Sequence, residues 1–305
     1  MKNSEFLREL EKKGYELKQN EKMSAHTSFK IGGAADFYIY PSSSDELVKL
    51  IKLCKEFDVP FFVIGKGSNL LVSDLGIEGA VIDTSKLNAI KQKSENVIFC
   101  ECGASLMRLC IFALEAGLSG LEFAFGIPGS VGGATVMNAG AYGGEISDVI
   151  KSCFCIDRDG NALTLLKKDM ALGYRTSVFK EKGLIVLSAE FELSMGDKSE
   201  IKEKMNGFME RRKQKQPLEF PSAGSTFKRP EGYFAGALIE KNGFKGKMCG
   251  GAQVSEKHAG FIINKDNANA EDIKNLINDI KETVLKNDNV LLEPEVIFIG
   301  RKEEG

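Results

Sequence analysis

The chain has 305 residues, of which 43% are hydrophobic and 28% are charged, and its formal net charge is −2. The length predicts two or three domains, or one large domain with an insert, and the composition is ordinary for a globular protein. The nearly neutral net charge excludes the large basic surface of a general nucleic-acid binder. The first 20 residues are charged throughout, and no run approaches the roughly 18 apolar residues of a membrane span. We therefore expect a cytosolic protein without a membrane span.

Short apolar strands alternate with amphipathic helices along the chain. Ser43 and Glu46 have the spacing of a capping box at the start of the first such helix, and Gly117 is placed to end the second. Asp159-Gly160 predicts a turn between two strands. The expected strands are 36–40, 61–64, 80–83, 97–102, 149–157, 184–193 and 295–299. The helical stripes are Leu47/Leu50/Ile51/Cys54, Leu106/Leu109/Cys110/Ala113, Ile201/Met205/Phe208/Met209 and Ile273/Leu276/Ile277/Ile280/Val284.

Seven cysteines and two histidines limit the chemistry. An odd number of cysteines in a cytosolic setting does not suit a disulfide framework. Two pairs, Cys100/Cys102 and Cys153/Cys155, lie in strand-like runs without the C-x-x-C spacing or histidine partners of a metal site. We interpret them as small buried hydrophobes, and we expect no metal.

A glycine-containing segment, 65–72, follows a buried strand. Its glycines bring backbone amides close to a ligand, and Ser68 and Asn69 add donors, which suits a pyrophosphate. The segment is neither a Walker A loop nor a Rossmann fingerprint, because it has no G-K-[ST] and Leu70 stands where the third glycine would be. A simple strand-ending turn remains the alternative.

A denser glycine-rich run, 126–134, is followed closely by 138–143. So many glycines are unfavourable for folding, because glycine loses the most conformational entropy and has no side chain to pack. They therefore indicate a ligand loop, although a tight irregular crossover would also use them. A third loop of small residues occupies 27–33. Three such loops favour an extended cofactor such as FAD over a mononucleotide.

Three further segments carry reactive side chains, although none is specific alone. Arg175 lies among short polar residues, Ser225 follows a glycine just beyond Pro217 and Pro221, and Glu295 stands at a strand start. A surface arginine, a turn serine and a solvated strand end would each explain one of them.

Together these segments resemble the UDP-N-acetylenolpyruvoylglucosamine reductase family over roughly residues 24–300. The resemblance implies an α+β protein with an FAD-binding fold of the PCMH (vanillyl-alcohol-oxidase-like) type. It implies FAD-binding subdomains at 1–85 and 86–196, a substrate-binding domain at 197–291, and a C-terminal strand at 292–305 that carries Glu295. No long tyrosine-bearing insert is present, so the shorter family type is indicated. The matching segments are 26–33, 65–72, 126–143, 174–177, 223–228, 250–255, 258–262 and 293–296.

The resemblance also implies a reaction in peptidoglycan precursor synthesis. NADPH reduces non-covalently bound FAD, and hydride then passes to C3 of UDP-N-acetylglucosamine enolpyruvate, which gives UDP-N-acetylmuramate. Arg175 and Glu295 match catalytic residues that stabilise an enolic intermediate, and Ser225 matches the proton donor to C2. Glu295 must be protonated to donate a hydrogen bond, which requires partial desolvation.

The remaining residues implied by the resemblance bind ligands. Tyr174, Lys215 and His258 are expected at the substrate. The chain departs from the family pattern at Arg229, Ala237 and Ile297, where Asn, Lys and Arg are expected. The expected FAD-binding residues are Thr27, Gly65, Lys66, Gly67, Ser68, Asn69, Leu70, Gly126, Ile127, Pro128, Gly129, Ser130, Gly132, Gly133, Asn138, Gly140 and Ala141.

Three other hypotheses remain. An FAD oxidase of the same fold would commonly attach its flavin to a histidine or cysteine, and only His26 lies in the N-terminal loop region. A non-catalytic nucleotide-binding protein would not need the intact trio of Arg175, Ser225 and Glu295. A redox-sensing protein would depend on the C-x-C pairs alone. The sequence does not define an oligomeric state.

Overall fold

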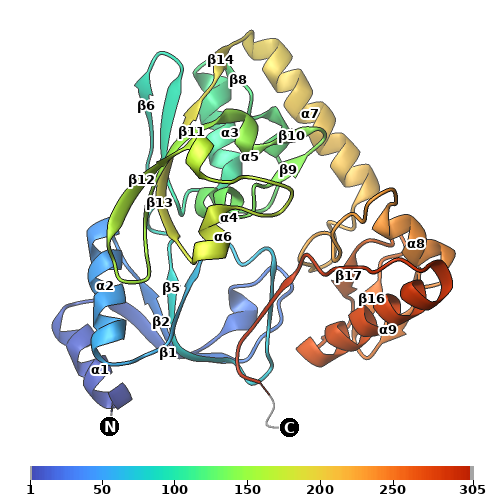
Figure 1. Cartoon of the computed structure of the whole chain (residues 1–305), viewed down its shortest axis with the longest axis horizontal. Helices are drawn as coiled ribbons and strands as arrows, with labels where there is room; N and C mark the ends of the chain where they lie inside the picture. The colour runs from blue at the N-terminus through green and yellow to red at the C-terminus, as the bar shows by residue number, and fades with distance from the viewer. Residues whose placement is uncertain (1, 303–305) are drawn as a thin grey trace. The chain divides into compact units, whose positions relative to one another are not determined.

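The computed structural model describes residues 2–302. Its contacts divide the chain into two compact units, each assembled from segments that are far apart in the sequence (Figure 1). Unit 1 contains residues 2–19, Phe37–Lys66 and Gly79–Arg211, and unit 2 contains Asn20–Asp36, Gly67–Glu78 and residues 212–302. The predicted assignment of roles to 1–85, 86–196, 197–291 and 292–305 stays a prediction.

A five-stranded antiparallel sheet forms the centre of unit 1, in the order β12-β11-β13-β7-β6 (Figure 1). The predicted strands at 97–102, 149–157 and 184–193 are confirmed as β7, β11 and β13. The predicted turn at Asp159-Gly160 joins β11 to β12, and Gly160 has a φ of 82°. The strands are β6 (Ile90–Ser94), β7 (Val97–Glu101), β11 (Ile150–Ile156), β12 (Ala162–Leu166) and β13 (Ile185–Glu192).

A second sheet has the order β1-β2-β5-β3, and β3 pairs with β5 in parallel. Strands β1, β2 and β5 each contain a point at which the chain passes from one unit to the other. The predicted strands at 36–40, 61–64 and 80–83 are confirmed here. The strands are β1 (Glu16–Lys22), β2 (Ala34–Tyr40), β3 (Phe61–Ile64) and β5 (Ile77–Asp83).

Helix α2 (Ser44–Glu56) begins as the sequence predicts, with Ser43 as its N-cap. The Ser43 hydroxyl accepts a hydrogen bond from the Glu46 amide at 3.2 Å. The second half of the predicted capping box is wrong: the Glu46 carboxylate accepts from the amide and hydroxyl of Ser42, at 2.7 and 2.8 Å. These bonds hold the pKa of Glu46 below its usual value. The predicted apolar stripe of the helix is buried in the core of unit 1.

Unit 1 also contains the helices α1 and α3 and several shorter elements. Helix α3 (Leu106–Glu115) is followed by Gly117, whose φ of 70° fits the predicted helix end. Helix α7 (Lys198–Lys215) belongs to unit 1 as far as Arg211, and its last turn belongs to unit 2. The other elements are α1 (Lys2–Lys12), β8 (Leu118–Ser119), α4 (Val131–Val136), β9 (Gly140–Ala141), β10 (Gly144–Glu145), α5 (Ile146–Val149), α6 (Val178–Lys182), β14 (Ser194–Met195) and the 3₁₀ turns Glu122–Ala124 and Lys167–Asp169.

Unit 2 has its own core, in which α9 packs against a three-stranded antiparallel sheet of order β15-β16-β17 (Figure 1). The predicted stripe of α9, from Ile273 to Val284, is fully or nearly fully buried. The elements are the 3₁₀ turn Met23–Ala25, β4 (Leu70–Val72), α8 (Ala235–Lys241), β15 (Met248–Cys249), β16 (Ala252–Val254), β17 (Ile262–Asn264), α9 (Ala270–Asp288) and β18 (Ile297–Ile299).

The last strand begins later than predicted. Strand β18 starts at Ile297 and pairs in parallel with β4, so Glu295 lies two residues before it. Pro294 instead forms an isolated bridge with Phe227. The chain therefore changes partner at Glu295, which the apolar pattern of the segment did not indicate.

None of the helices within residues 2–302 combines the length and apolar character that crossing a membrane requires. The interpretation of the two C-x-C pairs as buried hydrophobes is confirmed, since Cys100, Cys102, Cys153 and Cys155 are all buried. Cys54 and Cys110 are buried as well, and Cys249 is partly buried. Burial raises the pKa of Cys54, Cys100, Cys102 and Cys110 to about 12. These thiols are therefore neutral near pH 7, and a neutral thiol is a poor nucleophile.

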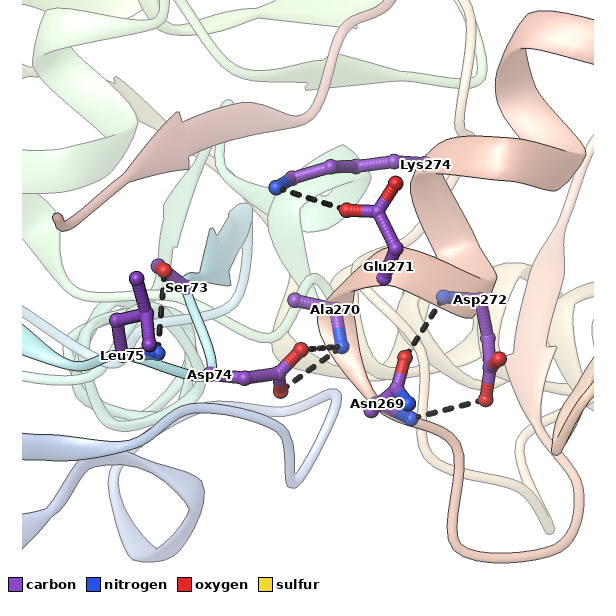
Figure 2. Close-up of polar contacts among 8 residues, drawn as sticks. All are labelled: Ser73, Asp74, Leu75, Asn269, Ala270, Glu271, Asp272 and Lys274. Atoms are coloured by element: carbon purple, nitrogen blue, oxygen red, sulfur yellow. Dashed lines mark hydrogen bonds and ion pairs between the residues drawn. The ribbon is translucent and has the colours of Figure 1, made fainter. Parts of the chain in front are cut away.

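Three side chains accept hydrogen bonds from backbone amides at the start of α9 (Figure 2). Asn269 and Asp272 form a capping box, in which each side chain accepts from the other residue's backbone amide, at 2.8 and 3.1 Å. Asp74 reaches across from the segment after β4, and its two carboxylate oxygens lie 3.0 and 2.9 Å from the Ala270 amide nitrogen. Asp74 therefore connects the cofactor-loop segment of unit 2 to its longest helix.

Replacing Asp74 by alanine should lower the free energy of unfolding by about 1–2 kcal/mol, because an amide at the positive end of a 19-residue helix loses its charged acceptor. Asp74→Asn keeps an acceptor oxygen and should lose less. Glu271→Ala is the matched control, since Glu271 is an exposed acid in the first turn of α9 and pairs with partly buried Lys274 at 3.3 Å. Urea denaturation measures all three. An Asp74→Ala midpoint equal to that of Glu271→Ala would remove the capping role.

Candidate active site

Two of the predicted cofactor loops touch within unit 1. A Cβ placed on Gly65 would lie 2.1 Å from the Ser130 hydroxyl oxygen, so a side chain at position 65 would displace that hydroxyl. Ser130 is buried and caps α4, and its hydroxyl accepts from the Gly133 amide at 3.3 Å. The structure therefore brings Gly65 together with the second glycine-rich segment, as one ligand site requires.

Helix α4 lies within the glycine-rich segment, where the sequence predicted no helix. Its first amides, those of Val131 and Gly132, donate to the carbonyls of Ala104 and Cys102, each at 2.8 Å. A Cβ on Gly132 would lie 2.9 Å from the Cys102 Cβ, so this glycine serves close packing. Helix–strand contacts thus stabilise a sequence with low helix propensity. The only local signal for the helix start was Ser130, a favourable N-cap.

The loop at 65–72 also touches the third predicted cofactor loop, 27–33, within unit 2. The Ser28 amide donates to the Gly67 carbonyl at 3.2 Å, and the buried Thr27 hydroxyl donates to the Ile31 carbonyl at 3.0 Å. Gly67 has a φ of 59°, and a Cβ there would lie 2.1 Å from the His26 carbonyl oxygen. The turn at Gly67 is therefore possible only with glycine.

The segment from Lys66 to Ser68 fits a phosphate group. Within residues 2–302, the consecutive amides of Lys66, Gly67 and Ser68 donate no hydrogen bond to the protein. Consecutive amides around a left-handed residue form a concave donor surface that binds anions. The residues present here therefore fit the pyrophosphate of a dinucleotide such as FAD.

A hairpin at the end of the second glycine-rich segment is held by aromatic packing. Tyr142 joins β9 to β10 with a φ of 55°, and its ring stacks on Phe208 of α7 with centroids 4.7 Å apart and planes 5° apart. The Arg211 guanidinium lies 5.0 Å from the same ring. These contacts fix the hairpin that carries Gly140 and Ala141.

Arg175 lies in unit 1, in a tight turn between Gly173 and Thr176, which form a two-residue bridge. Its backbone is left-handed, with a φ of 57°, which is uncommon for a residue other than glycine. The guanidinium donates to the carbonyls of Asn138 and Gly140, at 3.5 and 3.3 Å, and stacks 5.1 Å from the ring of exposed Tyr174. The predicted catalytic arginine is thus attached to the predicted cofactor segment.

Ser225 and Glu295 lie in unit 2, on neighbouring backbone segments. The Glu295 amide donates to the Thr226 carbonyl at 2.8 Å, and the Lys228 amide donates to the Glu293 carbonyl at 2.9 Å. Buried Thr226 also accepts from the Ile262 amide through its hydroxyl, at 3.0 Å. Ser225 itself is exposed and Glu295 is partly buried. The role of Thr226 was not predictable from the sequence, because no residue near it in the chain indicates its pairing.

Asn69 connects the first predicted cofactor loop to this pair. Its side-chain amide donates to the Glu295 carbonyl at 3.1 Å, and its own carbonyl accepts from the Ile297 amide at 2.9 Å. Residues 226 positions apart in the chain are therefore in direct contact. The predicted cofactor loop and the predicted catalytic acid share one local framework in unit 2.

Lys215 and His258, both in unit 2, are close enough to interact electrostatically. Burial is the main cause that lowers the pKa of His258, and the charge of Lys215 lowers it further, while Glu240 opposes both. The His258 Nδ1 accepts from the Gly260 amide at 3.0 Å. The neutral ring therefore carries its proton on Nε2.

The predicted site residues are divided between the units. Gly65, Lys66, Arg175, Tyr174 and the residues from 126 to 141 belong to unit 1. Thr27, the residues from 67 to 70, Lys215, Ser225, His258 and Glu295 belong to unit 2. Of the positions that depart from the family pattern, Arg229 stacks 4.1 Å from the Phe234 ring, Ala237 is exposed on α8, and Ile297 begins β18.

Comparisons with known proteins agree with this arrangement. Residues 35–166 match a family model described as an FAD binding domain, and residues 216–299 match the C-terminal domain of UDP-N-acetylenolpyruvoylglucosamine reductase. The chain is 50% identical to the UDP-N-acetylenolpyruvoylglucosamine reductase of Clostridium novyi (strain NT) over 289 residues, which cover 95% of this chain and 94% of the relative. It is 52% identical to that of Clostridium botulinum (strain Hall) over 283 residues, covering 93% and 92%.

A solved structure supports the same conclusion. The crystal structure of UDP-N-acetylenolpyruvylglucosamine reductase from Thermus caldophilus aligns with a TM-score of 0.79 at 33% identity, covering 93% of this chain and 98% of the other. The fold and its glycine-lined loops define an FAD-dependent oxidoreductase, with a PCMH-type FAD-binding fold followed by a C-terminal α+β domain, as predicted. The chain belongs to the UDP-N-acetylenolpyruvoylglucosamine reductase family, whose reaction uses FAD and NADPH in peptidoglycan precursor synthesis.

Proposed function

We propose that this chain reduces UDP-N-acetylglucosamine enolpyruvate to UDP-N-acetylmuramate in the cytosol, with electrons from NADPH. The observation that supports the proposal most directly is the backbone pairing of Thr226 with Glu295, which brings the segment that carries exposed Ser225 next to the segment that carries partly buried Glu295. Bound FAD, held without a covalent bond, would supply hydride transfer between NADPH and the enolpyruvyl double bond. The protein's own side chains would then have to stabilise the negative charge that develops on the substrate and supply one proton.

Three residues would act on the substrate. Arg175 would stabilise the negative charge that spreads into the substrate carboxylate, because its guanidinium is always charged. Glu295, when protonated, would donate a hydrogen bond to the same enolic group. Ser225 would give its hydroxyl proton to C2, which is feasible only because the carbanion at C2 is strongly basic.

The other residues of the proposed site would bind FAD or the substrate. Thr27, Gly65 to Leu70, Gly126 to Ser130, Gly132, Gly133, Gly140 and Ala141 would line the FAD site. The sequence also led us to expect Asn138 there, but its buried amide is bonded to Gly173 and Ser147 and is left out of the proposed FAD contacts. Tyr174, Lys215 and His258 would contact the substrate, with Lys215 near its phosphates. In this proposal residues 1–85 and 86–196 contribute the two parts of the FAD-binding fold, residues 197–291 bind the substrate, and 292–305 bring Glu295 to it.

The test is an anaerobic visible absorption spectrum of the purified protein, first with NADPH and then with UDP-N-acetylglucosamine enolpyruvate. The proposal expects a flavin band that bleaches with NADPH and returns with the enolpyruvyl substrate. A band that bleaches without returning would leave an FAD oxidoreductase with another substrate, such as an oxidase of the same fold. A protein that neither carries nor binds FAD would overturn the proposal.

A further inference from the structure

Asn138 is a polar residue of unit 1 that is completely buried, as Thr135 and Ser177 also are. It follows Met137, the C-cap of α4, and its φ of 42° places it in the left-handed region. Glycine and asparagine are the usual residues at such a helix end. The backbone alone would therefore accept glycine, so the amide side chain needs a separate explanation.

That side chain uses both of its ends within the protein. Its Nδ2 donates to the Gly173 carbonyl at 3.1 Å, and its Oδ1 accepts from the Ser147 amide at 2.8 Å. The first bond reaches the turn that contains Arg175, and the second fixes the orientation of the amide. A side chain that is buried and engaged in this way supports the surrounding backbone.

The main chain of Asn138 also contacts Arg175. Its carbonyl accepts from Arg175 Nη1 at 3.5 Å, beside the bond from Nη2 to the Gly140 carbonyl at 3.3 Å. One residue thus contacts both the start of the Arg175 turn and the end of the Arg175 side chain. A left-handed residue such as Arg175 persists only where its surroundings determine its conformation.

We infer that Asn138 is a positioning residue that fixes the Arg175 guanidinium for the substrate step, and that it acts through Arg175. The inference rests on the proposed function, in which Arg175 stabilises charge on the substrate. It differs from the cofactor contact expected from the sequence, because the buried amide is bonded to Gly173 and Ser147. A shift of about 1 Å in a charge-stabilising group costs on the order of 10²-fold in rate.

The deciding variant is Asn138→Asp in the FAD-loaded enzyme. An ionised carboxylate has nearly the same shape and still accepts from the Ser147 amide, but it cannot donate to the Gly173 carbonyl. Reoxidation of the NADPH-reduced flavin by the enolpyruvyl substrate is expected to slow by about 10- to 100-fold. The FAD content and the rate of flavin reduction by NADPH are expected to stay within about 2-fold of wild type, since positioning of Arg175 concerns only the substrate step.

A double-mutant cycle separates positioning from a general structural effect. In an Arg175→Ala background, adding Asn138→Asp is expected to slow reoxidation by less than about 3-fold, because the group it positions is already gone. Asn289→Asp is the matched control, since Asn289 is the C-cap of α9 and is also left-handed, with a φ of 56°, but is exposed. It should leave both half-reactions unchanged.

The outcomes distinguish the inference from the proposed function. A wild-type reoxidation rate in Asn138→Asp, or a full additional loss in the Arg175→Ala background, would overturn the inference alone. An Arg175→Ala enzyme that reoxidises normally would overturn the role of Arg175 itself. If Asn138→Asp does not fold with FAD, Asn138→Gly replaces it in the cycle, because glycine accepts the positive φ and removes both side-chain bonds.

Discussion

Replacing Ser225 by alanine is expected to slow reoxidation of the reduced flavin by the enolpyruvyl substrate by about 10²- to 10⁴-fold, the contribution typical of a positioned proton donor. Reduction of the flavin by NADPH is expected to remain near the wild-type rate. The reason is that the hydroxyl is needed only when a proton must reach C2 of the substrate. Rapid-mixing absorbance measurements of the two half-reactions give the two rates separately.

The structure makes this variant a clean one. Ser225 is exposed, whereas its neighbour Thr226 makes the bonds that hold the segment: its hydroxyl accepts from the Ile262 amide and its carbonyl accepts from the Glu295 amide. Removing the Ser225 hydroxyl therefore leaves the framework intact. Ser222→Ala, three residues earlier in the same segment, is the matched control and should leave both rates unchanged. Equal losses in the two half-reactions of Ser225→Ala would show that Ser225 supports the loop and does not donate the proton.

Replacing Gly67 by alanine should strongly weaken FAD binding and lower the stability of unit 2. The new Cβ would lie 2.1 Å from the His26 carbonyl oxygen and 3.1 Å from the Thr27 Cα, and both are backbone atoms that cannot rotate away. The φ of 59° adds the cost of a left-handed alanine. Together these effects should lower the free energy of unfolding by about 2–4 kcal/mol and weaken FAD at least about 10-fold.

A second glycine isolates the steric part of this effect. Gly243 has a φ of 74°, and a Cβ there would meet no atom within 4 Å. Gly243→Ala should therefore cost only the left-handed conformation, about 1 kcal/mol, without a change in FAD affinity. Urea denaturation and FAD titration of both variants test the difference. Equal stability losses at the two positions would mean that the Thr27 loop yields to the added methyl group, and that the close approach at Gly67 is not required.

The sequence predicted most completely those elements whose stability is local. The stripe from Leu47 to Cys54 and the N-cap at Ser43 identified α2, and the stripe from Ile273 to Val284 identified α9, because an apolar period and a cap are properties of neighbouring residues. Helix α4 was not predicted. Its first amides bond to Ala104 and Cys102, about 30 positions earlier, and its glycines reflect packing rather than propensity.

The candidate site shows the same limit. The resemblance identified Arg175, Ser225 and Glu295 by their motifs, and local composition identified the loops at Gly65 and Gly126. No local pattern indicated that Asn69 bonds to Glu295, that Thr226 joins Ser225 to Glu295, or that Asn138 holds the Arg175 turn. These contacts depend on which distant segments become neighbours, and one chain read in order does not contain that information.

The uneven distribution of the cysteines gives each unit its own chemical reporter. All six buried thiols belong to unit 1, whereas partly buried Cys249 is the only cysteine of unit 2 within the described residues. A thiol-alkylating reagent can reach the six only when unit 1 opens, so their labelling rate in native buffer measures the free energy of that opening. Cys249 reacts without such an event. Mass spectrometry of partly labelled protein would therefore measure the opening of unit 1 from the labelling of its six thiols. The labelling of Cys249 in unit 2 would serve as the internal reference.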